Sequence, residues 1–173
     1  KVVATDIVGT NGVIHVIDQV ILPISNGSIL DAAMGLEDFS SLVAALAKAN
    51  LASTFMMDGA YTVFAPTNDA FAKLPKGTVS NLLKKENKDA LTGILTYHVV
   101  AGSYTASDVV SAIKKNNGNF VIPTVQGGTI TASILNGNVI LTDMNGNTSK
   151  VIITDVKATN GVIHAIDSVV MPN

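Results

Sequence analysis

The sequence predicts an α+β domain whose helices come first along the chain and whose strands follow. Between residues 28 and 115, apolar residues recur at the three-to-four-residue spacing of amphipathic helices. From Phe120 onward, β-branched residues form short runs instead. Asn136-Gly137, between two of these runs, is a specific signal for a type I′ hairpin turn. Together these observations favour a helical N-terminal half packed on an antiparallel-rich β-sheet system.

Several segments carry the start signals and buried stripes of helices. Ser28-Ile29-Leu30-Asp31 and Thr105-Ala106-Ser107-Asp108 each place a hydroxyl at the N-cap and a carboxylate three residues later, which is a capping box. Asn87 is a third candidate N-cap. Two apolar stripes follow the i, i+3, i+4, i+7 spacing of a buried helix face: Phe39, Leu42, Val43 and Leu46, and then Leu91, Ile94, Leu95 and His98.

The strands are predicted from β-branched runs and from the prolines that interrupt them. Tyr61–Ala65 is a strand candidate that Pro66 ends, and Asn68–Leu74 is a short helix that Pro75 ends. In the second half, strands are expected at Val121-Ile122, Thr129–Leu135, Val139–Thr142, Val151–Val156 and Val162–Val170.

An internal repeat organises the chain. Lys1–Pro23 aligns without gaps with Lys150–Pro172 at an offset of 149 residues, and 14 of the 23 positions are identical. Residues 1–23 are therefore expected to be the C-terminal strand pair of a preceding, similar repeat. Residues 24–27 are the expected linker, and residues 28–173 the complete domain.

The composition excludes several classes of function. All 11 basic residues are lysines and the net charge is −2, so the planar arginine fork typical of nucleic-acid recognition is missing. The lack of cysteine excludes disulfides and thiol nucleophiles. The longest uncharged stretch is broken throughout by Asn, Gly, Thr and Gln, so no membrane span is predicted. No metal or phosphate motif and no nucleophile elbow is found, so we expect no catalytic residue, no metal site, no cofactor and no enzymatic activity.

Three segments, in order, resemble the signatures of the fasciclin-like (FAS1) domain family. They are Tyr61–Phe71, with the sequence YTVFAPTNDAF, Leu95–Gly102, with a central Tyr-His pair, and Asn160–Asp167, with the sequence NGVIHAID. Residues 1–23 resemble the third signature a second time. The resemblance implies a FAS1-like fold and a tandem parent protein. It also implies a secreted or cell-surface location and a role in adhesion or matrix contact rather than catalysis.

The same resemblance supplies candidate contact residues. Asn87-Lys88-Asp89-Ala90-Leu91 resembles an integrin-contact motif of animal relatives, and the Tyr97-His98 pair lies in a segment implicated in such contact. The residues themselves allow a simpler interpretation. Asn87 and Asp89 suit the start of a helix, and His98 continues an apolar stripe as a hydrogen-bonded core histidine. His164 alternates with Val162 and Ile166 and is likewise expected to be structural.

Two functions from different classes follow. The first is an adhesion or protein-interaction module that binds a surface or matrix protein or a carbohydrate, with Asn87, Lys88, Asp89, Leu91, Tyr97 and His98 as its contact residues. The alternative is a carrier for a small apolar ligand or a carbohydrate. The hairpin predicted in residues 1–23 has apolar β-branched residues to bury. It is therefore expected to pack on its own domain or to pair between chains as a homo-oligomer.

Overall fold

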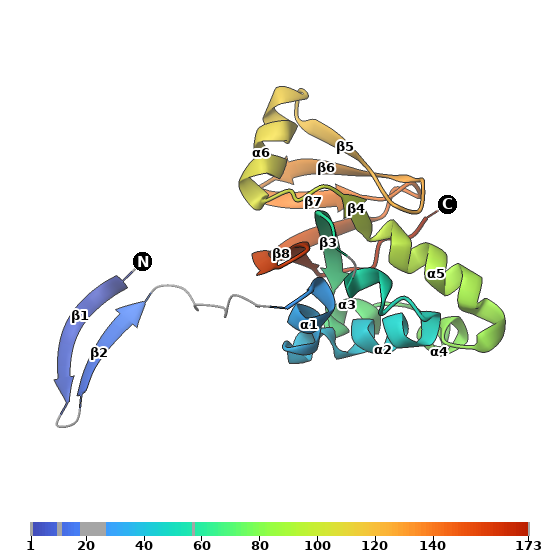
Figure 1. Cartoon of the computed structure of the whole chain (residues 1–173). Coiled ribbons are helices and arrows are strands. Elements are labelled where there is room, and N and C mark those ends of the chain that lie inside the picture. Colours follow the sequence, from blue (N-terminus) through green and yellow to red (C-terminus); the bar gives the residue numbers. More distant parts are fainter. Residues whose placement is uncertain (1, 10–11, 18–26, 57, 173) are drawn as a thin grey trace.

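The computed structural model describes residues 2–9, 12–17, 27–56 and 58–172. A seven-stranded sheet organises the main body, residues 27–172, in the strand order β4-β3-β9-β8-β7-β6-β5 (Figure 1). The strands are β3 Tyr61–Pro66, β4 Val99–Ala101, β5 Asn119–Pro123, β6 Thr129–Leu135, β7 Asn138–Thr142, β8 Thr148–Ala158 and β9 Gly161–Ile166. Only β3 and β9 pair in parallel, and every other pair is antiparallel. The predicted α+β class is confirmed.

All the helices described precede the antiparallel meander of strands β5 to β9, as predicted. They are α1 Ile29–Met34, α2 Ser40–Ala49, α3 Asn68–Ala72, α4 Thr78–Leu82, α5 Lys88–Tyr97 and α6 Ala106–Lys115, with the 3-10 turns η1 Glu37–Phe39, η2 Thr54–Met56 and η3 Lys85–Asn87. Both predicted capping boxes form, at Ser28 for α1 and at Thr105 for α6. The helices α1 to α5 gather at one end of the sheet and α6 lies at the other (Figure 1).

The strands β3 and β9 run between two hydrophobic cores. Val63, Ala65, Ile163 and Ala165 face the first core, which is formed with α1, α2 and α5. Phe64 and Ile166 face the second core, where α6 packs against β5, β6 and β7. All residues from Val162 to Ile166 are buried. Like β3, the strand β9 is therefore covered on both faces and paired along both edges.

Some boundaries differ from the sequence prediction. The Asn136-Gly137 turn has positive φ at both residues, 51° and 79°, as a type I′ turn requires. The strand β9 ends at Ile166, earlier than the predicted Val170, and the edge strand β4 was not predicted at all. Asn87 occupies the N-cap of α5, but its side chain makes no cap hydrogen bond, and its Nδ2 donates to the Asn81 carbonyl at 2.8 Å. The reason is that η3 runs directly into α5, and the Lys88 amide is bonded to Lys85.

The N-terminal segment forms a hairpin of two strands, β1 Val2–Gly9 and β2 Gly12–Ile17. These strands make a sheet of their own and add no strand to the seven-stranded sheet. Their register is Val2↔Ile17, Ala4↔Val16, Ile7↔Ile14, Val8↔Val13 and Gly9↔Gly12. The register of β8 and β9 is the same at an offset of 149 residues: Val151↔Ile166, Ile153↔Ala165, Val156↔Ile163, Lys157↔Val162 and Ala158↔Gly161. The repeat in sequence is thus a repeat in structure, with both register shifts at equivalent positions.

Candidate functional site

The six predicted contact residues lie on one segment but at two depths. Asp89 is exposed, and Asn87 and Lys88 are half-buried at the start of α5. Leu91, Tyr97 and His98 belong to the interior, with exposed fractions of 4%, 0% and 2%. Of the six, Asn87, Lys88 and Asp89 are therefore accessible from solvent, whereas the other three support the segment from inside.

Both ring nitrogens of His98 are occupied by backbone groups. Nδ1 lies 2.8 Å from the Ile94 carbonyl oxygen, and the Val170 amide donates to Nε2 at 3.3 Å. A carbonyl only accepts and an amide only donates, so the neutral ring with its proton on Nδ1 satisfies both. Burial lowers the pKa of His98 to about 4, although the bond to Ile94 acts in the opposite direction. The expected role as a satisfied core histidine is confirmed in its geometry.

His164 has the same kind of environment with the opposite tautomer. Its Nε2 lies 2.8 Å from the Tyr104 carbonyl oxygen, and the Asp155 amide donates to Nδ1 at 3.3 Å. Burial lowers the pKa of His164 as well, against the opposing effects of the Tyr104 bond and the Asp155 charge. Because neither histidine has a nitrogen free for substrate, neither is placed to act as a general base.

Tyr97 joins α5 to the strand meander. Its hydroxyl donates to the Thr129 carbonyl at 2.5 Å and accepts from the Met144 amide at 3.2 Å. Burial raises the pKa of Tyr97, and the Met144 amide partly offsets this rise. Tyr97 and His98 together fix the end of α5 against β6, the β7–β8 turn and the C-terminal segment.

A lysine-rimmed hollow lies beside the start of α5. It has a volume of about 410 Å³ and is lined by Ala47, Lys48, Asn50, Leu83, Lys84, Lys85, Lys88 and Leu91. With its amide oriented so that Nδ2 donates to the Ala47 carbonyl, Asn50 accepts from Lys88 Nζ at 2.9 Å. None of the four lysines forms an ion pair within the part of the chain that the structure describes.

The sequence predicted only two of the eight residues that line this hollow. Lys88 and Leu91 were candidates, and the neighbouring Lys84 and Lys85 are visible as a short basic run. Lys48 and Asn50 come from the end of α2, and only the packing of α2 against α5 brings them to the same place. Asn50 ends α2 in the left-handed conformation, with φ of 58°. Such a residue is a common helix C-cap, so a helix end here was the available signal.

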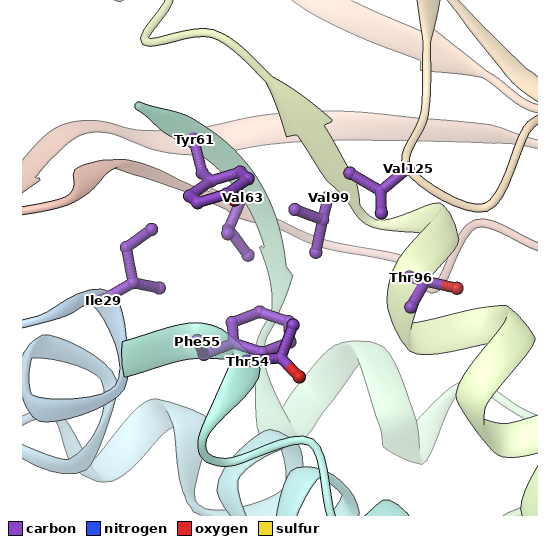
Figure 2. A pocket seen from close by; sticks show the side chains of 8 residues that line it. All are labelled: Ile29, Thr54, Phe55, Tyr61, Val63, Thr96, Val99 and Val125. Atoms are coloured by element: carbon purple, nitrogen blue, oxygen red, sulfur yellow. The ribbon is translucent and has the colours of Figure 1, made fainter. Parts of the chain in front are cut away.

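A smaller apolar pocket opens between α1, η2, β3 and β4. Its cavity of about 70 Å³ is lined by Ile29, Thr54, Phe55, Tyr61, Val63, Thr96, Val99 and Val125 (Figure 2). Ligand pockets for drug-sized molecules are typically about 300–1,000 Å³. The pocket therefore gives no support to the carrier alternative as far as a small apolar ligand is concerned.

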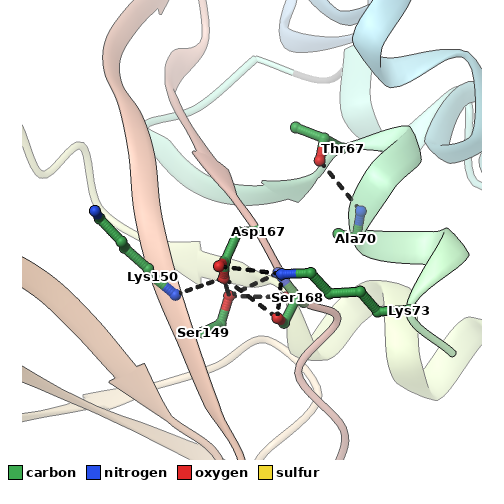
Figure 3. Close-up of polar contacts among 7 residues, drawn as sticks. All are labelled: Thr67, Ala70, Lys73, Ser149, Lys150, Asp167 and Ser168. Atoms are coloured by element: carbon green, nitrogen blue, oxygen red, sulfur yellow. Dashed lines mark hydrogen bonds and ion pairs between the residues drawn. The ribbon is translucent and has the colours of Figure 1, made fainter.

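A group of polar contacts lies at the C-terminal end of β9. Lys73 Nζ lies 3.1 Å from Asp167 Oδ2, and the Lys150 amide donates to Asp167 Oδ1 at 2.8 Å (Figure 3). Burial would raise the pKa of Asp167, but the hydrogen bonds from Lys150 and Lys73 outweigh it and the pKa is lowered. The same Figure shows Thr67 capping α3 through the Ala70 amide. These contacts tie α3 to the end of β9 and are structural.

The described residues also limit other kinds of site. They contain no group of three His, Asp or Glu side chains that could hold a metal ion. None of the helices described is long and apolar enough to cross a membrane.

Comparison with known proteins identifies the family. The Fasciclin domain family matches residues 37–172. The chain belongs to this family. Protein sll1483 of Synechocystis sp. is 46% identical to this Fasciclin domain over 145 residues, which are 84% of this chain and 73% of that protein. The transforming growth factor-beta-induced protein ig-h3 of Oryctolagus cuniculus is 35% identical over 171 residues, 99% of this chain but only 23% of that protein.

A solved structure confirms the fold. A FAS1 domain pair from the insect cell adhesion molecule Fasciclin I matches with a TM-score of 0.77 at 22% identity, covering 96% of this chain and 58% of that one. The expected FAS1-like fold is thus confirmed.

Proposed function

We propose that this Fasciclin domain is an adhesion module of an extracellular or cell-surface protein and that it has no enzymatic activity. The lysine-rimmed hollow carries the proposal. Its volume of about 410 Å³ lies within the range of binding pockets, and it includes Lys88 and Leu91 of the predicted contact segment. The solved Fasciclin relative is a cell adhesion molecule.

The charge of the hollow indicates what kind of partner it binds. Lys48, Lys84, Lys85 and Lys88 contribute four positive charges, and subtracting them from the net charge of −2 leaves −6 on the rest of the chain. Glu86 and Asp89 are neighbours in sequence but do not line the hollow. A concentrated positive region on an otherwise acidic protein attracts and orients acidic partners.

The lining of the hollow also has an apolar component. Ala47, Leu83 and Leu91 line it together with the four lysines. We propose that the partner is a surface or matrix molecule that presents carboxylate or sulfate groups, including an acidic carbohydrate. Lysine suits these groups as a point charge without the bidentate geometry of arginine.

Charge reversal tests this proposal. We expect the triple variant Lys84→Glu, Lys85→Glu, Lys88→Glu to bind immobilised dextran sulfate and polygalacturonate at least about tenfold more weakly than the natural chain. The control is Lys114→Glu, Lys115→Glu, which reverses two exposed lysines at the end of α6, outside the hollow. Binding should also fall as salt is raised toward 0.5 M.

The two probes separate sulfate from carboxylate recognition, because only the first carries sulfate. A natural chain that binds neither probe, or a control variant that loses as much binding as the triple variant, would contradict the proposal.

The parent protein is proposed to contain Fasciclin domains in tandem. In this organisation residues 1–23 are the last strands of a preceding domain, residues 24–27 a linker and residues 28–173 the complete domain. The similarities to ig-h3 and to the Fasciclin I domain pair support it, since they extend over 99% and 96% of this chain, more than the single domain occupies.

A further inference from the structure

We infer that Asn50 is a positioning residue of the lysine-rimmed hollow, and that Lys88, which it holds, binds the anionic group of the partner at a fixed place. The other three lysines of the hollow, Lys48, Lys84 and Lys85, attract the partner without fixing it. The inference rests on the adhesive function proposed above and assigns different roles to the four lysines of that site.

The end of α2 has the backbone conformation that glycine adopts most easily. Asn50 follows the last helical residue with φ of 58° and ψ of 32°. Its amide donates to the Ala47 carbonyl at 3.2 Å, and the Leu51 amide donates to the Leu46 carbonyl at 2.9 Å, which are the two bonds of a Schellman motif. Glycine reaches this left-handed conformation without the steric cost of a Cβ atom. The backbone alone is therefore best served by glycine, and a side chain at this position indicates a further role.

The side chain of Asn50 connects the end of α2 to Lys88. With the amide orientation described above, Nδ2 donates to the Ala47 carbonyl at 3.3 Å and Oδ1 accepts from Lys88 Nζ at 2.9 Å. Lys88 is the first residue of α5. The helices α2 and α5 pack against each other in the first core, where Leu46 and Leu91 are 1% and 4% exposed. The ammonium group of Lys88 is thus held between two helices that buried apolar side chains fix in place.

Lys88 differs from the other three lysines in burial and in contacts. It is half-buried, whereas Lys48, Lys84 and Lys85 are exposed. No hydrogen bond or ion pair within the described residues holds the ammonium groups of these three. A long side chain loses rotamer freedom when a partner immobilises it, and one that is held in advance loses less. Since an ammonium has three N–H donors, the bond to Asn50 leaves Lys88 two for an anion.

The surroundings of Lys88 determine how it contributes to binding. It lines the hollow together with Leu83 and Leu91, so a carboxylate or sulfate bound to it would have apolar neighbours. Charges at an exposed rim chiefly accelerate association, whereas charges in close, partly shielded contacts chiefly slow dissociation. We therefore expect the three exposed lysines to set the association rate, and Lys88 with Asn50 to set the dissociation rate.

Kinetic measurements on single variants test the inference. The natural chain and its variants are passed over immobilised dextran sulfate and polygalacturonate in surface plasmon resonance. Asn50→Gly removes no charge and supplies the residue that suits the helix end. We expect it to raise the dissociation rate at least about fivefold and to leave the association rate within about twofold. Lys85→Gln removes one charge and should do the reverse, lowering the association rate and leaving the dissociation rate within about twofold.

The double variant Asn50→Gly, Lys88→Gln shows whether Asn50 acts through Lys88. Lys88→Gln alone should raise the dissociation rate at least as much as Asn50→Gly does, and the double variant should dissociate no faster than Lys88→Gln. Lys114→Gln, which lies outside the hollow, is the control and should change neither rate. If Asn50→Gly had the same effect with and without Lys88, the inference would be overturned, because the asparagine would then act by another route, such as the helix end itself.

The remaining outcomes separate this inference from the adhesive proposal. Charge reversal at Lys84, Lys85 and Lys88 could weaken binding while Asn50→Gly leaves the dissociation rate unchanged. That result would overturn the inference alone, because the hollow would then bind acidic partners through its net charge. A natural chain that binds neither polymer would overturn both.

Discussion

At the scale of single residues, His98 is an uncharged part of the core. The ring accepts from Val170 and donates to Ile94, so adding a proton to Nε2 would break one bond and place a buried charge. The ordinary pKa of 6.5 applies to the unfolded chain, and the folded pKa is about 4. Between these values the unfolded state binds more protons than the folded state. Stability from this group is therefore complete above pH 6.5 and is lost as pH falls toward 4.

We predict that lowering the pH from 7 to 4 removes about 3 kcal/mol of unfolding free energy through His98. His98→Asn should be less stable at pH 7 by about 1–3 kcal/mol, through lost packing and an unpaired buried partner. Its stability should depend less steeply on pH in this window. Urea unfolding of both proteins at pH 7, 5.5 and 4.5 measures the difference. Since His164 titrates in both chains, equal slopes would show that His98 does not carry the effect.

The structural role of His98 was predictable from the sequence, but only one of its two hydrogen-bond partners was. Ile94 lies four residues before it, and a helical stripe implies such a neighbour. Val170 lies 72 residues away, and only the path of the chain after β9 brings it near. The same difference applies to the hollow, where Lys88 could be predicted and Lys48 could not. Local periodicity indicates which face of a helix is buried, but not which distant element covers it.

At the scale of elements, the buried strand β9 depends on the close approach of β3. Both predicted capping boxes and the type I′ turn form as expected because each depends on residues within a few positions. The edge strand β4 was missed because Val99–Ala101 is only three residues long and directly follows the α5 stripe. Its strand conformation comes from pairing with β3, a contact that local sequence does not specify.

The approach of β3 to β9 leads to a paired prediction for two equivalent glycines. Gly161→Ala should cost about 3 kcal/mol or more, or prevent folding, because a Cβ atom would overlap with the Tyr61 carbonyl oxygen. Gly12→Ala should leave the melting temperature of the natural chain unchanged, because the described residues place no such strand against β2. Thermal unfolding followed by circular dichroism compares the two. Equal losses in both variants would mean that the glycine serves the hairpin turn itself and not the neighbouring strand.

At the scale of the whole molecule, the seven-stranded sheet and its two hydrophobic cores make up one folded body. The first core joins α1, α2 and α5 to the sheet, and the second joins α6 to the meander. Within the described residues no buried side-chain nitrogen or oxygen lacks a hydrogen-bond partner. The buried polar side-chain atoms of the described body are therefore satisfied by its own elements, and its sheet takes no strand from the β1–β2 hairpin.

Deletion of residues 1–26 is accordingly predicted to leave the body intact. Since β1 and β2 contribute no strand to the seven-stranded sheet, the shortened chain should melt within about 2 °C of the natural chain, a difference that corresponds to about 0.5–1 kcal/mol in a domain of this size. Both chains should sediment as monomers. Differential scanning calorimetry gives the melting temperature, and analytical ultracentrifugation at two concentrations gives the mass. A drop of 5 °C or more in the shortened chain would mean that the hairpin packs on its own body. A dimer formed only by the natural chain would show instead that residues 1–26 join two copies.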